Sequence, residues 1–60
     1  GQIVRLLTAA PHTVAALVAR MYVGLDPRLA GAAARSVLAH LLDLERRGVV
    51  TQEEGAWRII

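Results

Sequence analysis

The first part of the chain places apolar side chains at helical spacing. Within residues 2–10 they share one helical face, at positions Ile3, Leu6, Leu7 and Ala10. Pro11 interrupts this pattern, and Thr13 is suited to cap a second helix that runs from Val14 to about Tyr22. Three residues of this second helix are small enough to let a neighbouring helix approach closely: Ala15, Ala16 and Ala19. The pattern predicts a helix, a sharp turn and a helix.

A third helix is indicated further along the chain. Asp26 can cap it and Pro27 can occupy its first position, but Gly31 costs about 1 kcal/mol relative to alanine, so residues 27–30 are either a separate turn or its beginning. From Ala32 to Arg47 the helical pattern is strong. Its apolar arc is predicted to hold Ala34, Val37, Leu38, Leu41, Leu42 and Leu44. Its polar arc is predicted to hold Arg35, Ser36, Ala39, His40, Asp43, Arg46 and Arg47.

The chain ends in a predicted β-hairpin. Gly48 is suited to end the third helix, and two β-branched or aromatic runs, 49–52 and 56–60, then flank Glu53-Glu54-Gly55. Val50 and either Trp57 or Ile59 should share the face that covers the helices. Three helices followed by a two-stranded antiparallel wing is the element order of a winged helix-turn-helix. The predicted fold class is therefore mainly α with a small β-hairpin.

Size and composition restrict what this chain can do alone. Sixty residues without cysteine form a single winged-helix domain, residues 1–60, with no disulfide framework. Of the 55% apolar residues eleven are alanine, which leaves little core for a self-sufficient enzyme. No apolar stretch approaches the ~20 residues of a membrane span. Because the chain starts at Gly1 and not at methionine, we expect it to be a domain of a longer protein. We expect the domain to be non-catalytic and the protein to be cytoplasmic.

The charge pattern is less basic than the isoelectric point of about 10.5 suggests. The net charge is only +2, and all seven basic residues are arginines, so almost nothing titrates between the histidines and pH ~10. The wing tip is acidic, at Glu53 and Glu54, where a wing that binds nucleic acid normally carries lysine or arginine. The isoelectric point alone therefore does not indicate a nucleic-acid partner.

Two segments, residues 13–22 and 33–50, resemble one particular group of winged-helix domains. They resemble the C-terminal winged-helix domain of metallo-β-lactamase-fold hydrolases of the lactamase-beta-like type, in which a helix begins at Thr and ends at Tyr, and an Ala-His-Leu segment precedes a Gly before the wing. The matching positions are Thr13, Tyr22, Ala33, Ala34, Ser36, Val37, Ala39, His40, Leu41, Leu44 and Gly48. One departure is the acidic residue often found two positions after the Thr, where Ala15 and Ala16 stand here.

The resemblance implies a parent protein with an N-terminal metallo-β-lactamase-fold domain that holds zinc. This domain would dock on it, border its substrate cleft, and contact RNA there if the parent is one of the RNA-cleaving members. No cofactor or metal site is expected within residues 1–60, because His12 and His40 are the only histidines and no thiol is present. No membrane partner is expected, and homo-oligomerisation stays open.

The candidate face for a partner or a nucleic acid lies on the third helix, at Arg35, Ser36, His40, Arg46 and Arg47. The alternative function is a DNA-binding winged-helix transcriptional regulator, whose corresponding helix would enter the major groove. Asp43 can neutralise Arg46 and Arg47, and this makes the face weak for that task. We expect His40 to pack at an interface, His12 to be a solvated loop residue, and Trp57 to close the core.

Overall fold

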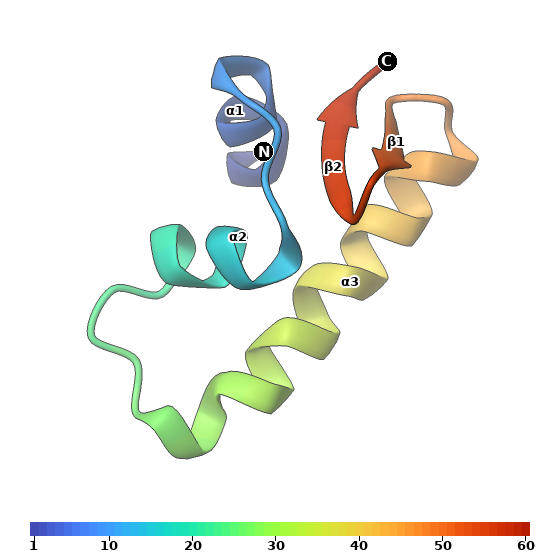
Figure 1. Cartoon of the computed structure of the whole chain (residues 1–60). Helices are drawn as coiled ribbons and strands as arrows, with labels where there is room; N and C mark the ends of the chain where they lie inside the picture. The colour runs from blue at the N-terminus through green and yellow to red at the C-terminus, as the bar shows by residue number, and fades with distance from the viewer.

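The computed structural model describes all 60 residues and has the predicted element order (Figure 1). Three α-helices and one 3₁₀ turn come first: α1 (Gln2–Ala9), α2 (Val14–Met21), η1 (Pro27–Leu29) and α3 (Ala30–Arg46). The hairpin follows and consists of β1 (Val50–Glu53) and β2 (Ala56–Ile59). This arrangement is a winged helix, and it confirms the fold class predicted from the sequence. The molecule is elongated, with extents of 32 × 23 × 20 Å, because α3 projects beyond the rest.

Short-range signals define the helix boundaries. The Thr13 hydroxyl accepts a hydrogen bond from the backbone N–H of Ala16 at 3.1 Å, which confirms the predicted cap of α2. The Asp26 carboxylate accepts from the backbone N–H of Arg28 at 2.9 Å and starts η1. The open question about residues 27–30 is thereby answered: Pro27–Leu29 forms a 3₁₀ turn that runs directly into α3 at Ala30. Gly31 lies within the first turn of α3.

The core lies where α1, α2 and the hairpin meet the middle and C-terminal part of α3. Seven buried apolar residues form it: Ile3, Leu7, Leu17, Val37, Leu41, Val50 and Trp57. Trp57 is only 2% exposed, so it closes the core as predicted. No polar or charged residue is buried. Each helix contributes at least one side chain, so the fold depends on all three helices meeting the wing.

The hairpin has a two-residue turn. Glu54 and Gly55 both have positive φ, 53° and 81°, which is the geometry that joins strands with the native right-handed twist. Val50 pairs with Ile59, and Gln52 pairs with Trp57. Because cross-strand partners point to the same side of a sheet, Trp57 and Ile59 both share the face of Val50. Of these three side chains Ile59 is half-buried, and the other two are core residues.

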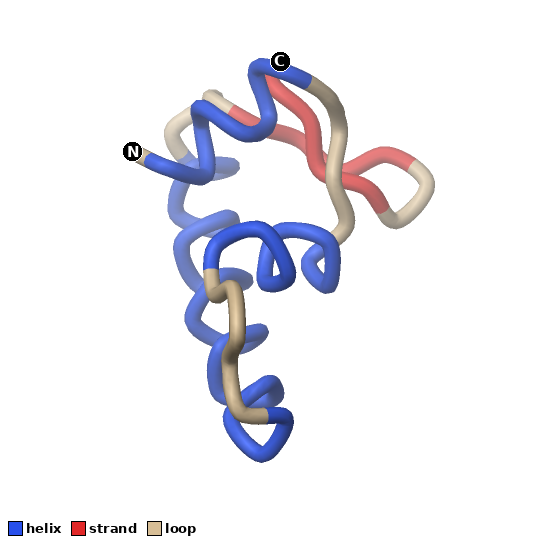
Figure 2. Tube along the Cα trace, turned by 90° about the vertical axis from the view of Figure 1, so that its left-hand side faces the viewer, coloured by secondary structure: helices blue, strands red, loops and turns tan.

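One residue of the segment between α1 and α2 pairs with the hairpin as an isolated β-bridge. The N–H of His12 donates to the Trp57 carbonyl at 3.0 Å, and the N–H of Trp57 donates to the His12 carbonyl at 2.7 Å (Figure 2). His12 is half-buried, and its Nδ1 lies 2.7 Å from the Ala10 carbonyl oxygen. His12 thus lies in the loop as expected, but it is half-buried rather than fully solvated, and its backbone pairs with β2.

Candidate functional site

Four of the five residues of the predicted face lie on α3 and the fifth, Arg47, is its C-cap; all are exposed: Arg35, Ser36, His40, Arg46 and Arg47. They do not form one uniform surface. His40 borders a shallow hollow against the start of α1, where it lies with Asp43 and Leu44 beside Gln2 and Val4. These neighbours of His40 belong to the same domain. Its predicted role at an interface with a partner stays a prediction.

The two arginines at the end of α3 are engaged by one carboxylate. Arg46 Nη2 lies 3.7 Å from Asp43 Oδ1, and Arg47 Nε lies 3.2 Å from Asp43 Oδ2. These are the i, i+3 and i, i+4 pairs that the spacing indicated. Asp43 thus removes much of the positive potential of the C-terminal end of α3, which a phosphate backbone would need.

Two further arginines are paired elsewhere. Arg28 Nη2 contacts Asp26 Oδ2 at 2.8 Å, and its hydrogen bonds hold the pKa of the Asp26 carboxyl below its ordinary value and raise the pKa of Arg28. On the wing, Arg58 Nη2 lies 3.6 Å from Glu53 Oε2. The arginines without an ion pair are therefore Arg5, Arg20 and Arg35, one on each of the three α-helices.

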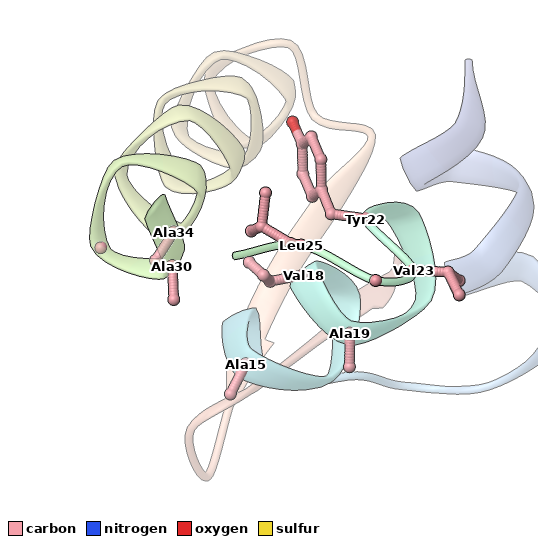
Figure 3. A pocket seen from close by; sticks show the side chains of 10 residues that line it. Ala15, Val18, Ala19, Tyr22, Val23, Leu25, Ala30 and Ala34 are labelled. Atoms are coloured by element: carbon pink, nitrogen blue, oxygen red, sulfur yellow. The ribbon is translucent and has the colours of Figure 1, made fainter. Parts of the chain in front are cut away.

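The largest concave feature is an apolar groove between α2 and the N-terminal end of α3 (Figure 3). Its volume is about 650 Å³, and the loop between the two helices forms part of its wall. Eight of its ten lining residues are apolar, and the full set is Ala15, Val18, Ala19, Tyr22, Val23, Gly24, Leu25, Ala30, Gly31 and Ala34. The groove carries no ionisable group other than the Tyr22 phenol.

The groove was not predicted from the sequence. The small residues of α2 were expected to let another helix pack closely, but Ala15 and Ala19 are exposed and line the open groove. Small residues at the other wall, Ala30, Gly31 and Ala34, belong to the start of α3. Small side chains on two facing helices leave the space between them unfilled, and that pairing was the signal available in the sequence.

The apolar arc of α3 is also narrower than predicted. Ala33, Val37 and Leu41 are buried, whereas Leu38 and Leu42 are 38% and 42% exposed. The expected arc included both exposed leucines and omitted Ala33. The error arose because α2 and the hairpin cover α3 from one side only, so the arc extends past the edge of the core.

Two apolar side chains at this end of the domain are strongly exposed. Val23 in the loop is 88% exposed and Leu29 at the end of η1 is 54% exposed. Monomeric proteins expose single apolar side chains routinely, but a contiguous apolar patch marks a binding surface. The groove end of the domain therefore exposes an apolar surface, whereas the α3 arginine face is polar and charged.

The possible metal-ligating side chains are dispersed over the domain. No three His, Cys, Asp or Glu side chains gather as they would around a metal ion. His12 and His40 lie on different elements, the first in the connection after α1 and the second on α3. None of the helices combines the length and the apolar character needed to cross a lipid bilayer.

Comparison with known families identifies the domain type. Residues 13–57 match the model of the family described as the beta-lactamase associated winged helix domain. The match begins at the α2 cap and ends in β2, so it covers the helix-turn-helix and most of the wing. No curated protein and no solved structure matches the chain.

Proposed function

Since the chain belongs to the family of beta-lactamase associated winged helix domains, we propose that it is the non-catalytic accessory domain of a metallo-β-lactamase-superfamily hydrolase. In this proposal it docks on the zinc hydrolase domain of the same longer chain and borders the substrate cleft. Its partner is therefore a neighbouring domain, and the zinc chemistry belongs to that neighbour.

The apolar groove is the observation that carries this proposal. A 60-residue domain with only eight buried residues leaves a groove of about 650 Å³ and the exposed side chains of Val23 and Leu29 at one end. Covering apolar surface stabilises a complex by roughly 25 cal/mol per Å² of area removed from water. An apolar edge of the hydrolase domain is the occupant that would supply this burial.

Electrostatics favours a protein partner over duplex DNA. Four arginines are paired within the domain, and the wing tip presents Glu54 without an ion pair. On the predicted face only Arg35 is a cation free of a carboxylate partner. If RNA crosses the interface, as the resemblance implies for some members, Arg35 is the side chain of this face best placed to contact a phosphate.

The test compares two substitutions that each replace an alanine by glutamate. Ala19→Glu places a carboxylate in the groove, and Ala9→Glu places one on the exposed end of α1, outside it. The hydrolase domain, expressed without residues 1–60, is titrated calorimetrically with each variant chain. We expect Ala19→Glu to weaken binding at least tenfold and Ala9→Glu to leave it unchanged, since an unpaired charge buried in an apolar interface is costly.

A second measurement addresses the role in catalysis. The chain alone, with zinc supplied, should hydrolyse no substrate of the parent enzyme. Deleting the domain from the parent should lower activity or solubility. If the deleted enzyme is as active and as stable as the whole, the docking role is wrong.

A further inference from the structure

A second exposed apolar feature runs along α3, separate from the groove. Four residues recur at spacings of three, four and three: Arg35, Leu38, Leu42 and Glu45. This is the a and d spacing of a coiled-coil seam, which places the four side chains on one stripe of the helix. The two leucines are 38% and 42% exposed, and both charged residues are exposed. We define these four residues as the α3 seam.

The two charges of the α3 seam have no partner within the domain. Neither Arg35 nor Glu45 takes part in an ion pair. No charged residue stands three or four positions away from either of them along α3, so the helix itself offers no pairing. Figure 1 shows that α2 and the hairpin lie against the same side of α3, and the opposite side is uncovered along its length.

The order of the α3 seam is self-complementary when it is reversed. In an antiparallel pair of helices with its two-fold axis level with position 40, Leu38 faces Leu42 of the second copy and Arg35 faces Glu45 of the second copy. The same two contacts recur on the other side of the axis, as a two-fold interface requires. A parallel pair would place Arg35 against Arg35 and Glu45 against Glu45. Ala39, beside Leu38, carries only a methyl group, so the two helices can approach to the usual 8–10 Å.

We propose that the α3 seam is a homodimer interface in which two copies of this chain pair α3 against α3 in antiparallel orientation. The partner is a second copy of the chain, because the order of charges along the α3 seam is complementary to the same seam in reversed orientation. The seam covers only about three turns of helix, or ~16 Å. The interface is thus smaller than the usual ~1,600 Å², and we expect a dissociation constant of roughly 0.1–1 mM for the 60-residue chain. This inference does not depend on the proposed docking of the groove.

Charge exchange tests the pairing directly. Sedimentation equilibrium at low salt is measured for the unchanged chain, for Arg35→Glu, for Glu45→Arg and for the double variant. Each single change turns two attractive pairs into two repulsive ones, and we expect it to weaken dimerisation about tenfold. The double variant restores both attractive pairs with exchanged signs and should return to within about threefold of the unchanged chain.

A matched control separates the α3 seam from net charge. Arg20→Glu changes an arginine that is also exposed and unpaired, but on α2 and outside the seam. It should leave dimerisation unchanged, and circular dichroism should show the same helix content for every variant. A chain that stays monomeric at 1 mM (about the weakest expected constant) overturns the proposal, as does a double variant no better than the single ones.

Disulfide trapping tests the orientation. The natural chain has no cysteine, so introduced thiols report only on their own contacts. An equal mixture of Leu38→Cys and Leu42→Cys chains should give mainly the mixed disulfide, because these positions face one another only in the antiparallel register. Disulfides mainly between identical variants would mean a parallel pair and would overturn the assignment.

Discussion

The two ends of α3 differ in how completely their surroundings are packed. Around its middle and C-terminal half, Val37 and Leu41 are fully buried among α1, α2 and the wing. Around its N-terminal end, the neighbouring loop leaves a groove and exposes Val23 almost completely. The first region is held by contacts within the chain, whereas the second leaves apolar surface open to solvent. The core and the groove therefore lie at opposite ends of one helix.

Truncating Trp57 should give the largest effect. Trp57→Ala removes a side chain that is 2% exposed and contacts the core, and we expect a loss of about 3–5 kcal/mol in the free energy of unfolding. A domain of this size has little more than that in total, so the variant should be largely unfolded by circular dichroism at 25 °C. Val23→Ala, at the groove end, should change the free energy of unfolding by less than about 0.5 kcal/mol. Equal losses in the two variants would remove the distinction between the two ends.

Two adjacent leucines of α3 give the next largest contrast. Leu41 is fully buried and Leu42 is 42% exposed, although both were expected in the core. Leu41→Ala should lower the free energy of unfolding by about 2–5 kcal/mol. Leu42→Ala should cost less than about 1 kcal/mol, because little burial is lost. Urea denaturation of the two variants measures this, and a reversed order would contradict the edge of the core described above.

The α2 cap should have a moderate effect. Thr13→Ala removes the hydroxyl that accepts from Ala16, and we expect a loss of about 1 kcal/mol. Thr8→Ala is the control, because the Thr8 hydroxyl donates to the Val4 carbonyl within α1, at 2.7 Å, and caps no helix. Thermal unfolding should show a clear drop in Tm for the first variant only. A Tm unchanged by Thr13→Ala would mean that α2 is held by packing alone.

The smallest expected effect on stability comes from the Asp26–Arg28 pair near the groove, and it depends on pH. The pKa of Asp26 is lowered by the Arg28 hydrogen bonds, so its folded-state pKa lies below the unfolded one. The resulting stabilisation is fully present above pH ~4 and is lost as the pH falls through the lowered value. Asp26→Asn keeps a capping oxygen but not the charge. Its Tm should lie slightly below that of the unchanged chain at pH 7, and the difference should shrink as the pH falls below ~4 and through the lowered pKa of Asp26.

Much of the wing end could be predicted from the sequence. The Thr13 cap, the helix end at Gly48 and the hairpin follow from local chemistry, and the strand pattern predicted Val50 on the inner face with either Trp57 or Ile59. The burial of Ile3 and Leu7 is likewise consistent with their spacing on α1. Local signals suffice there because each position has one dominant environment.

The groove end could not be predicted in the same way. Whether Leu38 or Ala33 is buried depends on the angle at which α2 crosses α3, and helical spacing alone does not give that angle. The groove needs both helices in place before its two walls of small residues face one another. The role of His12 was missed for a related reason, since its partner Trp57 is distant in the chain.

The backbone pairing of His12 with Trp57 has a consequence for how the chain folds. The two residues are 45 positions apart (57 − 12), so the pairing closes a loop that contains most of the molecule. Contacts between distant segments form slowly relative to helices, which makes this closure a candidate for the late step of folding. The Trp57 amide nitrogen lies 2.7 Å from its acceptor, the His12 carbonyl oxygen, so its hydrogen should exchange with solvent only when the whole domain opens. Its exchange rate would report on global opening, and the loop amides of Val23 and Gly24, which donate no backbone hydrogen bond, would exchange freely.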